Sequence, residues 1–181
     1  MNLLFSNAFI RDALMKKNAI KITNQSLLQS ELNEIIKYAE RKIQSFHKVR
    51  KRIDSFWTVV KALFNKNVYQ QCVDDLSDVS EELDNILDTY DKFYVRNRKY
   101  FTSAIQKFLD EYRLYLECAT LASTKRLNIQ MVIQLLNVTK DSKYSVSQLK
   151  DMMNEMDSIQ EHCLEIVKRV NGIAAMIKGQ T

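Results

Sequence analysis

Residues 26–64 read SLLQSELNEIIKYAERKIQSFHKVRKRIDSFWTVVKALF. Apolar side chains recur here at intervals of three and four residues: Leu28, Leu32, Ile35, Ile36, Ala39, Ile43, Phe46, Ile53, Trp57, Val60 and Phe64. These residues form an apolar seam along one side of a helix. A seam that continues for about five heptads is typical of a long helix that packs against other helices. The stretch therefore predicts one helix over 26–64, which begins at a capping box formed by Ser26 and Gln29.

The same period continues on the C-terminal side of this stretch. It predicts further helical segments over 68–121, 127–138 and 145–178. The polar run 96–99 interrupts the first of them, which fits either one kinked helix or two helices with a tight joint. We expect a bend at 121–125. Ser145 and Gln148 form a second capping box, and Gly179 stands where a helix C-cap is expected.

The composition supports a helical fold throughout. The 181 residues include no proline and two glycines, whereas strands, turns and long loops normally use both. This argues against β-sandwiches, barrels and glycine-rich phosphate-binding folds. We predict an all-α fold with a single domain over 1–181, an elongated up-down bundle of four or five helices with long, coiled-coil-like antiparallel helices.

The N-terminal segment 1–22 differs from the other helical segments. Its apolar side chains project around most of a helical wheel and are Leu3, Leu4, Phe5, Ala8, Phe9, Ile10, Ala13, Leu14 and Met15. A surface helix shows a single apolar stripe instead. We expect an apolar helix here that is either clamped within the bundle or docked on something outside the chain.

Charge is distributed unevenly along a chain of net charge +5. Residues 1–67 hold 13 basic and 5 acidic side chains, residues 68–91 hold 8 acidic and no basic ones, and residues 92–181 hold 14 basic and 9 acidic ones. One interpretation is pairing between neighbouring antiparallel helices. The other is two exposed patches of opposite sign that serve partners or anionic lipid.

Basic side chains supply the candidate lipid- or partner-binding residues, which are Lys16, Lys17, Lys48, Arg50, Lys51, Arg52, Arg96, Arg98 and Lys99. In the run 47–52, a helix places residues 48, 51 and 52 on one side, where the charge faces solvent. Each basic residue near an anionic membrane contributes about 1 kcal/mol to binding. Nucleic acid is not expected as a partner, because neither interleaved aromatic residues nor a recognition helix is evident.

No motif in the chain predicts catalysis. The two histidines, His47 and His162, lack the Glu-x-x-His spacing of metal-binding bundles. Glycine-rich phosphate loops and nucleophile elbows are also missing. We therefore expect no enzyme, no cofactor, no metal and no small-molecule substrate. A helical enzyme or a metal-binding bundle stays as a third class of function, behind the two given below.

The three cysteines, Cys72, Cys118 and Cys163, are odd in number and lack short spacing. Each falls within an apolar stripe. This pattern favours free, buried thiols in a reducing compartment, and so a cytoplasmic protein. A location that is peripheral at membranes goes with the membrane-binding hypothesis.

Aromatic residues are dense between positions 90 and 115: Tyr90, Phe93, Tyr94, Tyr100, Phe101, Phe108, Tyr112 and Tyr115. Such residues pack cores and are also enriched at interfaces and in membrane-surface belts. Core packing is the favoured interpretation, with Tyr94 beside the seam and partly exposed.

The segments LQSELNEIIKYAERKIQSFHK (28–48) and CVDDLSDVSEELDNILDTY (72–90) together resemble two helices of HeLo-like cell-death bundles, the family that includes mixed-lineage-kinase-domain-like N-terminal four-helix bundles. The matching residues are Leu76, Asp78, Val79, Glu82 and Leu83. The match covers about 60 of 181 residues. The resemblance implies a bundle that binds acidic phospholipids and permeabilises membranes through Lys16, Lys17, Arg50, Lys51 and Arg52.

Together these features predict a non-enzymatic helical bundle that acts by association. The first hypothesis is binding or permeabilisation of an anionic membrane surface through the basic patches and the apolar N-terminal helix. The alternative is a soluble adaptor or scaffold that presents helical faces to a protein partner or to a second copy of itself.

Overall fold

The computed structural model describes residues 25–55, 67–138 and 145–179. Its elements in chain order are α2 (Gln25–Ile53), α4 (Asn67–Asn97), the 3-10 turn η1 (Arg98–Tyr100), α5 (Ser103–Val138) and α6 (Val146–Gly179). The four long elements are all α-helices, which confirms the all-α prediction. The predicted N-terminal helix 1–22 lies outside the described residues.

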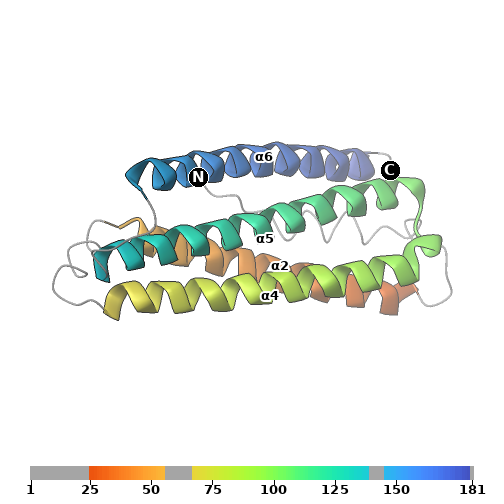
Figure 1. Ribbon diagram of the computed structural model, residues 1–181. Coiled ribbons are helices and arrows are strands. Elements are labelled where there is room, and N and C mark those ends of the chain that lie inside the picture. Colours follow the sequence, from red (N-terminus) through yellow and green to blue (C-terminus); the bar gives the residue numbers. More distant parts are fainter. Residues whose placement is uncertain (1–24, 56–66, 139–144, 180–181) are drawn as a thin grey trace.

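The four helices lie side by side in an elongated bundle (Figure 1). α2 packs on α4, α4 on α5 and α5 on α6. Glu31 near the start of α2 pairs with Arg96 near the end of α4. At the opposite end of the same two helices, Arg52 pairs with Asp75, so α2 and α4 are antiparallel. Cross-links between α4 and α5 and between α5 and α6 show the same reversal of direction, which confirms the up-down topology.

The aromatic residues between 90 and 115 lie mainly in the core. Tyr90 and Tyr112 are fully buried, and the Tyr90 hydroxyl donates a hydrogen bond of 2.7 Å to the carbonyl oxygen of Leu109. Tyr94 is only 8% exposed, so its expected partial exposure is wrong. Its hydroxyl donates to a carboxylate oxygen of Asp110 at 2.5 Å, which satisfies the polar end of a ring that α5 covers.

α2 ends at Ile53 and does not continue to residue 64 as predicted. The amide of Asp54 still bonds to the carbonyl of Arg50 at 2.9 Å, but the amide of Ser55 bonds only three residues back, to Arg52, at 3.2 Å. This tightened last turn closes the helix. The Asp54 carboxylate then pairs with the side chains of both Arg50 and Arg126. The seam residues Trp57, Val60 and Phe64 lie outside the described residues.

The segment 68–121 consists of two helices, α4 and α5, joined through η1. The joint lies at the polar run 96–99, which interrupts the apolar seam. The Asn97 side chain bonds back to the Phe93 carbonyl at 2.9 Å, and the Thr102 hydroxyl accepts a 3.4 Å bond from the Ile105 amide at the start of α5. These side chains replace the hydrogen bonds that a continuous helix makes.

The predicted bend at 121–125 is wrong, because α5 runs unbroken through it. The hydroxyls of Thr120 and Ser123 donate to helix carbonyls of Leu116 and Thr120 at 3.0 and 2.8 Å. The Thr124 hydroxyl lies 2.9 Å from that of Ser80 on α4. Polar residues that are typical of a bend thus bond within α5 and to its neighbour.

The capping box at the start of α6 is confirmed. The Gln148 amide donates to the Ser145 hydroxyl at 3.2 Å, and the Ser145 amide donates to the Gln148 side-chain oxygen at 2.7 Å. Each residue thus satisfies a backbone donor that the first helical turn leaves open.

The prediction of three free thiols is wrong for two of them. Cys118 of α5 and Cys163 of α6 form a disulfide with a Cα–Cα distance of 5.8 Å, and Cys72 remains free and buried. The two cysteines are 45 residues apart in sequence. The antiparallel packing of α5 on α6 places them at the same level, which spacing along the chain does not reveal.

Candidate functional site

The predicted basic residues lie at opposite ends of the bundle. Because α2 and α4 are antiparallel, one group lies near the C-terminal end of α2 and the other near the C-terminal end of α4. The first group is Lys48, Arg50, Lys51 and Arg52, and the second is Arg96, Arg98 and Lys99. Lys16 and Lys17 lie outside the described residues. The described residues therefore hold two separated basic groups and no continuous patch.

Three of these arginines are engaged in ion pairs. Arg50 lies 3.5 Å from Asp54, Arg52 pairs with Asp75, and Arg96 pairs with Glu31. The Asp75 and Glu31 contacts join α2 to α4, as does the 2.6 Å pair between Lys42 and Glu82. Part of the acidic segment thus neutralises the basic helix beside it, as the pairing interpretation expected.

Arg98 and Lys99 lie over aromatic rings at the joint between α4 and α5. The Arg98 guanidinium is 5.8 Å from the centre of the Tyr94 ring, and the Lys99 ammonium is 5.0 Å from that of Tyr100. Such contacts contribute about 0.5–1 kcal/mol at exposed sites. Both residues are exposed at the surface.

Lys48 and Lys51 are exposed near the end of α2, and no ion pair forms with either among residues 25–55, 67–138 and 145–179. They are the members of the first basic group best placed to meet an external anion.

The outer face of α5 carries a second candidate surface. Four large apolar side chains there, the outer row, are 40–53% exposed: Leu114, Leu121, Met131 and Leu135. The opposite face of α5 is buried along its length and includes Phe108, Tyr112 and Ile129. α5 is therefore apolar on the face that builds the core and also on part of the face that meets solvent.

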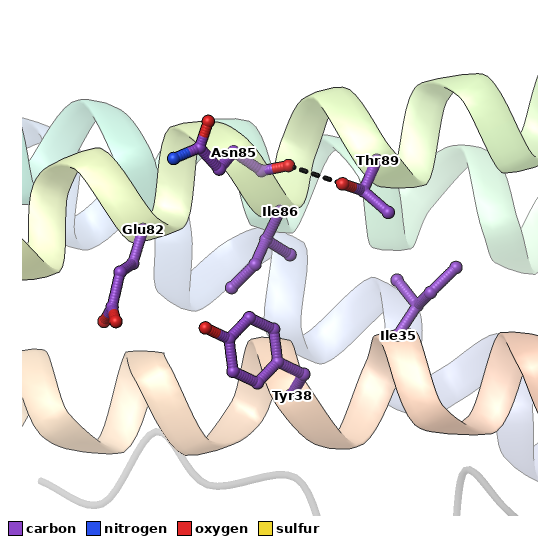
Figure 2. Close-up of a pocket in the computed structure, with 6 residues that line it drawn as sticks. All are labelled: Ile35, Tyr38, Glu82, Asn85, Ile86 and Thr89. Atoms are coloured by element: carbon purple, nitrogen blue, oxygen red, sulfur yellow. Dashed lines mark hydrogen bonds between the residues drawn. The ribbon is translucent and has the colours of Figure 1, made fainter.

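A groove of about 250 Å³ opens between α2 and α4 (Figure 2). Its lining residues are Ile35, Tyr38, Glu82, Asn85, Ile86 and Thr89. Figure 2 shows Ile86 pointing from α4 toward the Tyr38 ring on α2. Arg41 and Lys42 also lie 5.6 and 5.3 Å from the centre of that ring. The groove has an apolar floor and a charged rim, which suits an amphipathic side chain of a partner.

Glu40 is a buried acid that the sequence analysis missed. It is 4% exposed, and neither carboxylate oxygen has a hydrogen-bond partner among the described residues. Burial raises the pKa of this carboxyl to about 7. Burial raises the pKa of Tyr112 and Tyr115 on α5, and the charge of Glu40 adds to that rise. The sequence held one signal of this buried acid: Glu40 is a charged residue that follows the seam positions Ile36 and Ala39 and precedes Ile43.

A small pocket of about 20 Å³ lies beside the disulfide. It is lined by residues of α2, α5 and α6: Ile43, Phe46, His47, Arg50, Tyr115, Ala119, Ala122, Gln160 and Cys163. Burial, together with the nearby charges of Arg50 and Lys51, lowers the pKa of His47. His47 is therefore neutral at pH 7 and adds no charge to the pocket.

Within the three described ranges, no group of three or more His, Cys, Asp or Glu side chains is arranged to hold a metal ion. None of the helices in these ranges is both long and apolar enough to cross a bilayer.

Comparison of the chain with protein-family models, with curated proteins and with solved structures finds no match. The resemblance to HeLo-like bundles stays a prediction, and function is inferred from the surfaces described above.

Proposed function

We propose that this chain is a non-enzymatic helical bundle that works by protein–protein association, with a partner helix docked on the outer row of α5. The exposure of Leu114, Leu121 and Met131 carries the proposal. The bundle uses the other face of α5 for its core, and these side chains keep about half of their surface exposed. Rows of exposed apolar residues on a helix are the usual means of docking an amphipathic partner helix.

A photo-crosslinking amino acid at position 121 tests this proposal in the cells that produce the protein. We expect one discrete adduct, which disappears when Leu114→Lys and Met131→Lys are added. The matched control carries the crosslinker at Glu161, an exposed position on α6. The proposal fails if position 121 gives no adduct, or if both positions give the same adducts.

Binding to an anionic membrane surface is the second candidate function, favoured by exposed Lys48 and Lys51. It ranks lower because Arg50, Arg52 and Arg96 are held in ion pairs. Two exposed lysines contribute about 2 kcal/mol at such a surface, which gives weak binding that salt screens. Permeabilisation stays a prediction from the basic patches, the apolar segment 1–22 and the family resemblance, and a role in cell death is a prediction from the resemblance.

Co-sedimentation with vesicles tests the membrane candidate. Vesicles that contain phosphatidylserine should pellet the protein at low salt, whereas pure phosphatidylcholine vesicles should not. The double variant Lys48→Glu and Lys51→Glu should abolish pelleting. Lys150→Glu with Lys168→Glu makes the same charge change at exposed positions of α6 and should have a smaller effect. Equal loss in both variants would mean that overall charge, and not this site, drives binding.

The cytoplasmic location stays a prediction, and the argument for it from the cysteines no longer holds. It rested on three free thiols, whereas Cys118 and Cys163 are joined. Stable disulfides are rare in the cytosol and common in oxidising compartments.

A further inference from the structure

α6 is attached to the described bundle mainly through α5. Its buried apolar side chains are Met156, Ile166, Val170, Ile173, Ala174 and Ile177. Two surface ion pairs, Lys125 with Glu155 and Glu111 with Arg169, join α6 to α5 on either side of its midpoint. The Cys118–Cys163 disulfide lies between these two pairs and is the covalent link of the two helices.

One cysteine of this disulfide lines the small pocket. Cys163 lines the pocket, together with His47, Arg50 and Gln160, whereas Cys118 is not among its lining residues. The side chains of His47, Arg50 and Gln160 are each half-buried, so the pocket opens to solvent. Its volume of about 20 Å³ has room for one water-sized group. Both cysteines are 6% exposed, and the pocket gives a thiolate sulfur from solvent an approach on the side of Cys163.

The charge around the pocket favours an anion. Arg50 lines it, no acidic residue is among its lining residues, and the Asp54 carboxylate is shared between Arg50 and Arg126. One carboxylate thus offsets two guanidinium groups, and net positive charge remains. Thiol–disulfide exchange proceeds by attack of a thiolate, so a positive group at the entrance favours the reacting species.

We propose that the Cys118–Cys163 disulfide is a thiol-exchange site, which a low-molecular-weight anionic thiol enters at Cys163. The thiolate attacks the Cys163 sulfur, the protein S–S bond breaks, and Cys118 leaves as a thiolate that takes up a proton. A second thiolate attacks the small thiol's sulfur in the mixed disulfide and releases Cys163. The protein disulfide gains two electrons and two protons, and two small thiols become one disulfide.

Opening this link changes how firmly α6 is held. Its apolar contacts and the two ion pairs remain after reduction, so α6 stays helical and docked in most molecules. The loss of the cross-link lets it separate from α5 more often, since local opening depends on local contacts. We expect the amides of α6 to lose about a hundredfold in protection from hydrogen exchange, in line with the typical effect of one disulfide.

The entry site is tested with two thiols of opposite charge, mercaptoethanesulfonate and cysteamine. The full chain carries Cys72→Ala, so that only the disulfide pair reacts, and mass spectrometry follows adduct formation. We expect the adduct on Cys163. Arg50→Gln should lower the rate ratio of anionic to cationic thiol severalfold, whereas Arg41→Gln, the same change at an exposed position of α2, should leave the ratio unchanged. An adduct on Cys118, or equal effects of the two variants, would overturn the assignment of the entry site.

The structural consequence is tested by hydrogen exchange of the oxidised and reduced full chain. Protection should fall over α6 and stay unchanged over α4. The variant Cys118→Ala with Cys163→Ala should match the reduced protein without any reductant. Unchanged protection of α6, or three alkylatable thiols in protein purified without reductant, contradicts the proposal.

Discussion

Glu40 lies beside the apolar seam of α2 and is buried with it. It lies one turn from Ile36 and just under one turn from Ile43, both core residues of α2. A buried carboxylate without hydrogen bonds is costly, and the group lowers that cost by keeping its proton. This explains why burial raises the pKa of Glu40 to about 7, so that its carboxyl gains or loses its proton near neutral pH.

Glu40 should make the stability of the protein depend on pH. Its folded-state pKa of about 7 lies above the ordinary value of 4.5. Stability is therefore fully present below pH 4.5 and is lost as the pH rises through 7, by about 3 kcal/mol in total. Glu40→Gln should lack this loss in urea unfolding at pH 5 and pH 8. Glu81→Gln, at an exposed position of α4, should keep it. Identical pH profiles for Glu40→Gln and the unaltered chain would refute the assignment.

The buried hydroxyl of Tyr90 gives a second prediction at this scale. Tyr90→Phe removes the 2.7 Å hydrogen bond to the Leu109 carbonyl and should lower the free energy of unfolding by about 1 kcal/mol. Tyr38→Phe makes the same chemical change at a ring that is 41% exposed, and urea unfolding should show almost no effect. Equal losses in both variants would argue against a specific role of the buried bond.

Helices as elements were predictable, but several of their ends were not. The seam residues Leu32, Ile43 and Phe46 are buried as their spacing required. The end of α2 at Ile53 depends on a turn at Asp54 and on its pairing with Arg126, which is distant in sequence. The start of α6 was predictable because a capping box is a local signal, carried by two residues three positions apart.

Removing that cap should destabilise α6 at its start. Ser145→Ala deletes the hydroxyl that accepts the Gln148 amide and should cost about 1 kcal/mol in the free energy of unfolding. Ser147→Ala, an exposed position inside the first turn, should be neutral or slightly stabilising, because alanine is the better helix former. Chemical denaturation of both variants gives the comparison, and a cost at Ser147 as large as at Ser145 would contradict it.

At the scale of the whole molecule, packing decides which charges and thiols meet. The sequence showed basic and acidic segments, but only the antiparallel register assigns Glu31 to Arg96 and Asp75 to Arg52. The sequence therefore identified the types of side chain in the candidate sites and left their grouping open. The same holds for the exposed side of α5, because a helix that is apolar on both faces does not reveal which face the core uses.

The disulfide should contribute to the stability of the whole bundle. It closes a long loop, with cysteines 45 residues apart, and such links typically add about 2–4 kcal/mol. Addition of a reductant should lower the urea midpoint of the unaltered chain accordingly. The variant Cys118→Ala with Cys163→Ala serves as the control, since reductant should leave its midpoint unchanged. A midpoint of the unaltered chain that ignores reductant would show that the link adds no stability.

The placement of the two linked cysteines also bears on how the chain is made. A ribosome adds about 5–20 residues per second, so Cys163 is added about 2–9 s after Cys118. During that interval the surface of α5 that α6 later covers meets solvent or a chaperone. The thiol already synthesised at that stage is Cys72, which is a wrong partner for Cys118. Oxidation of the nascent chain therefore gives the native link only after Cys163, near the middle of α6, has been translated.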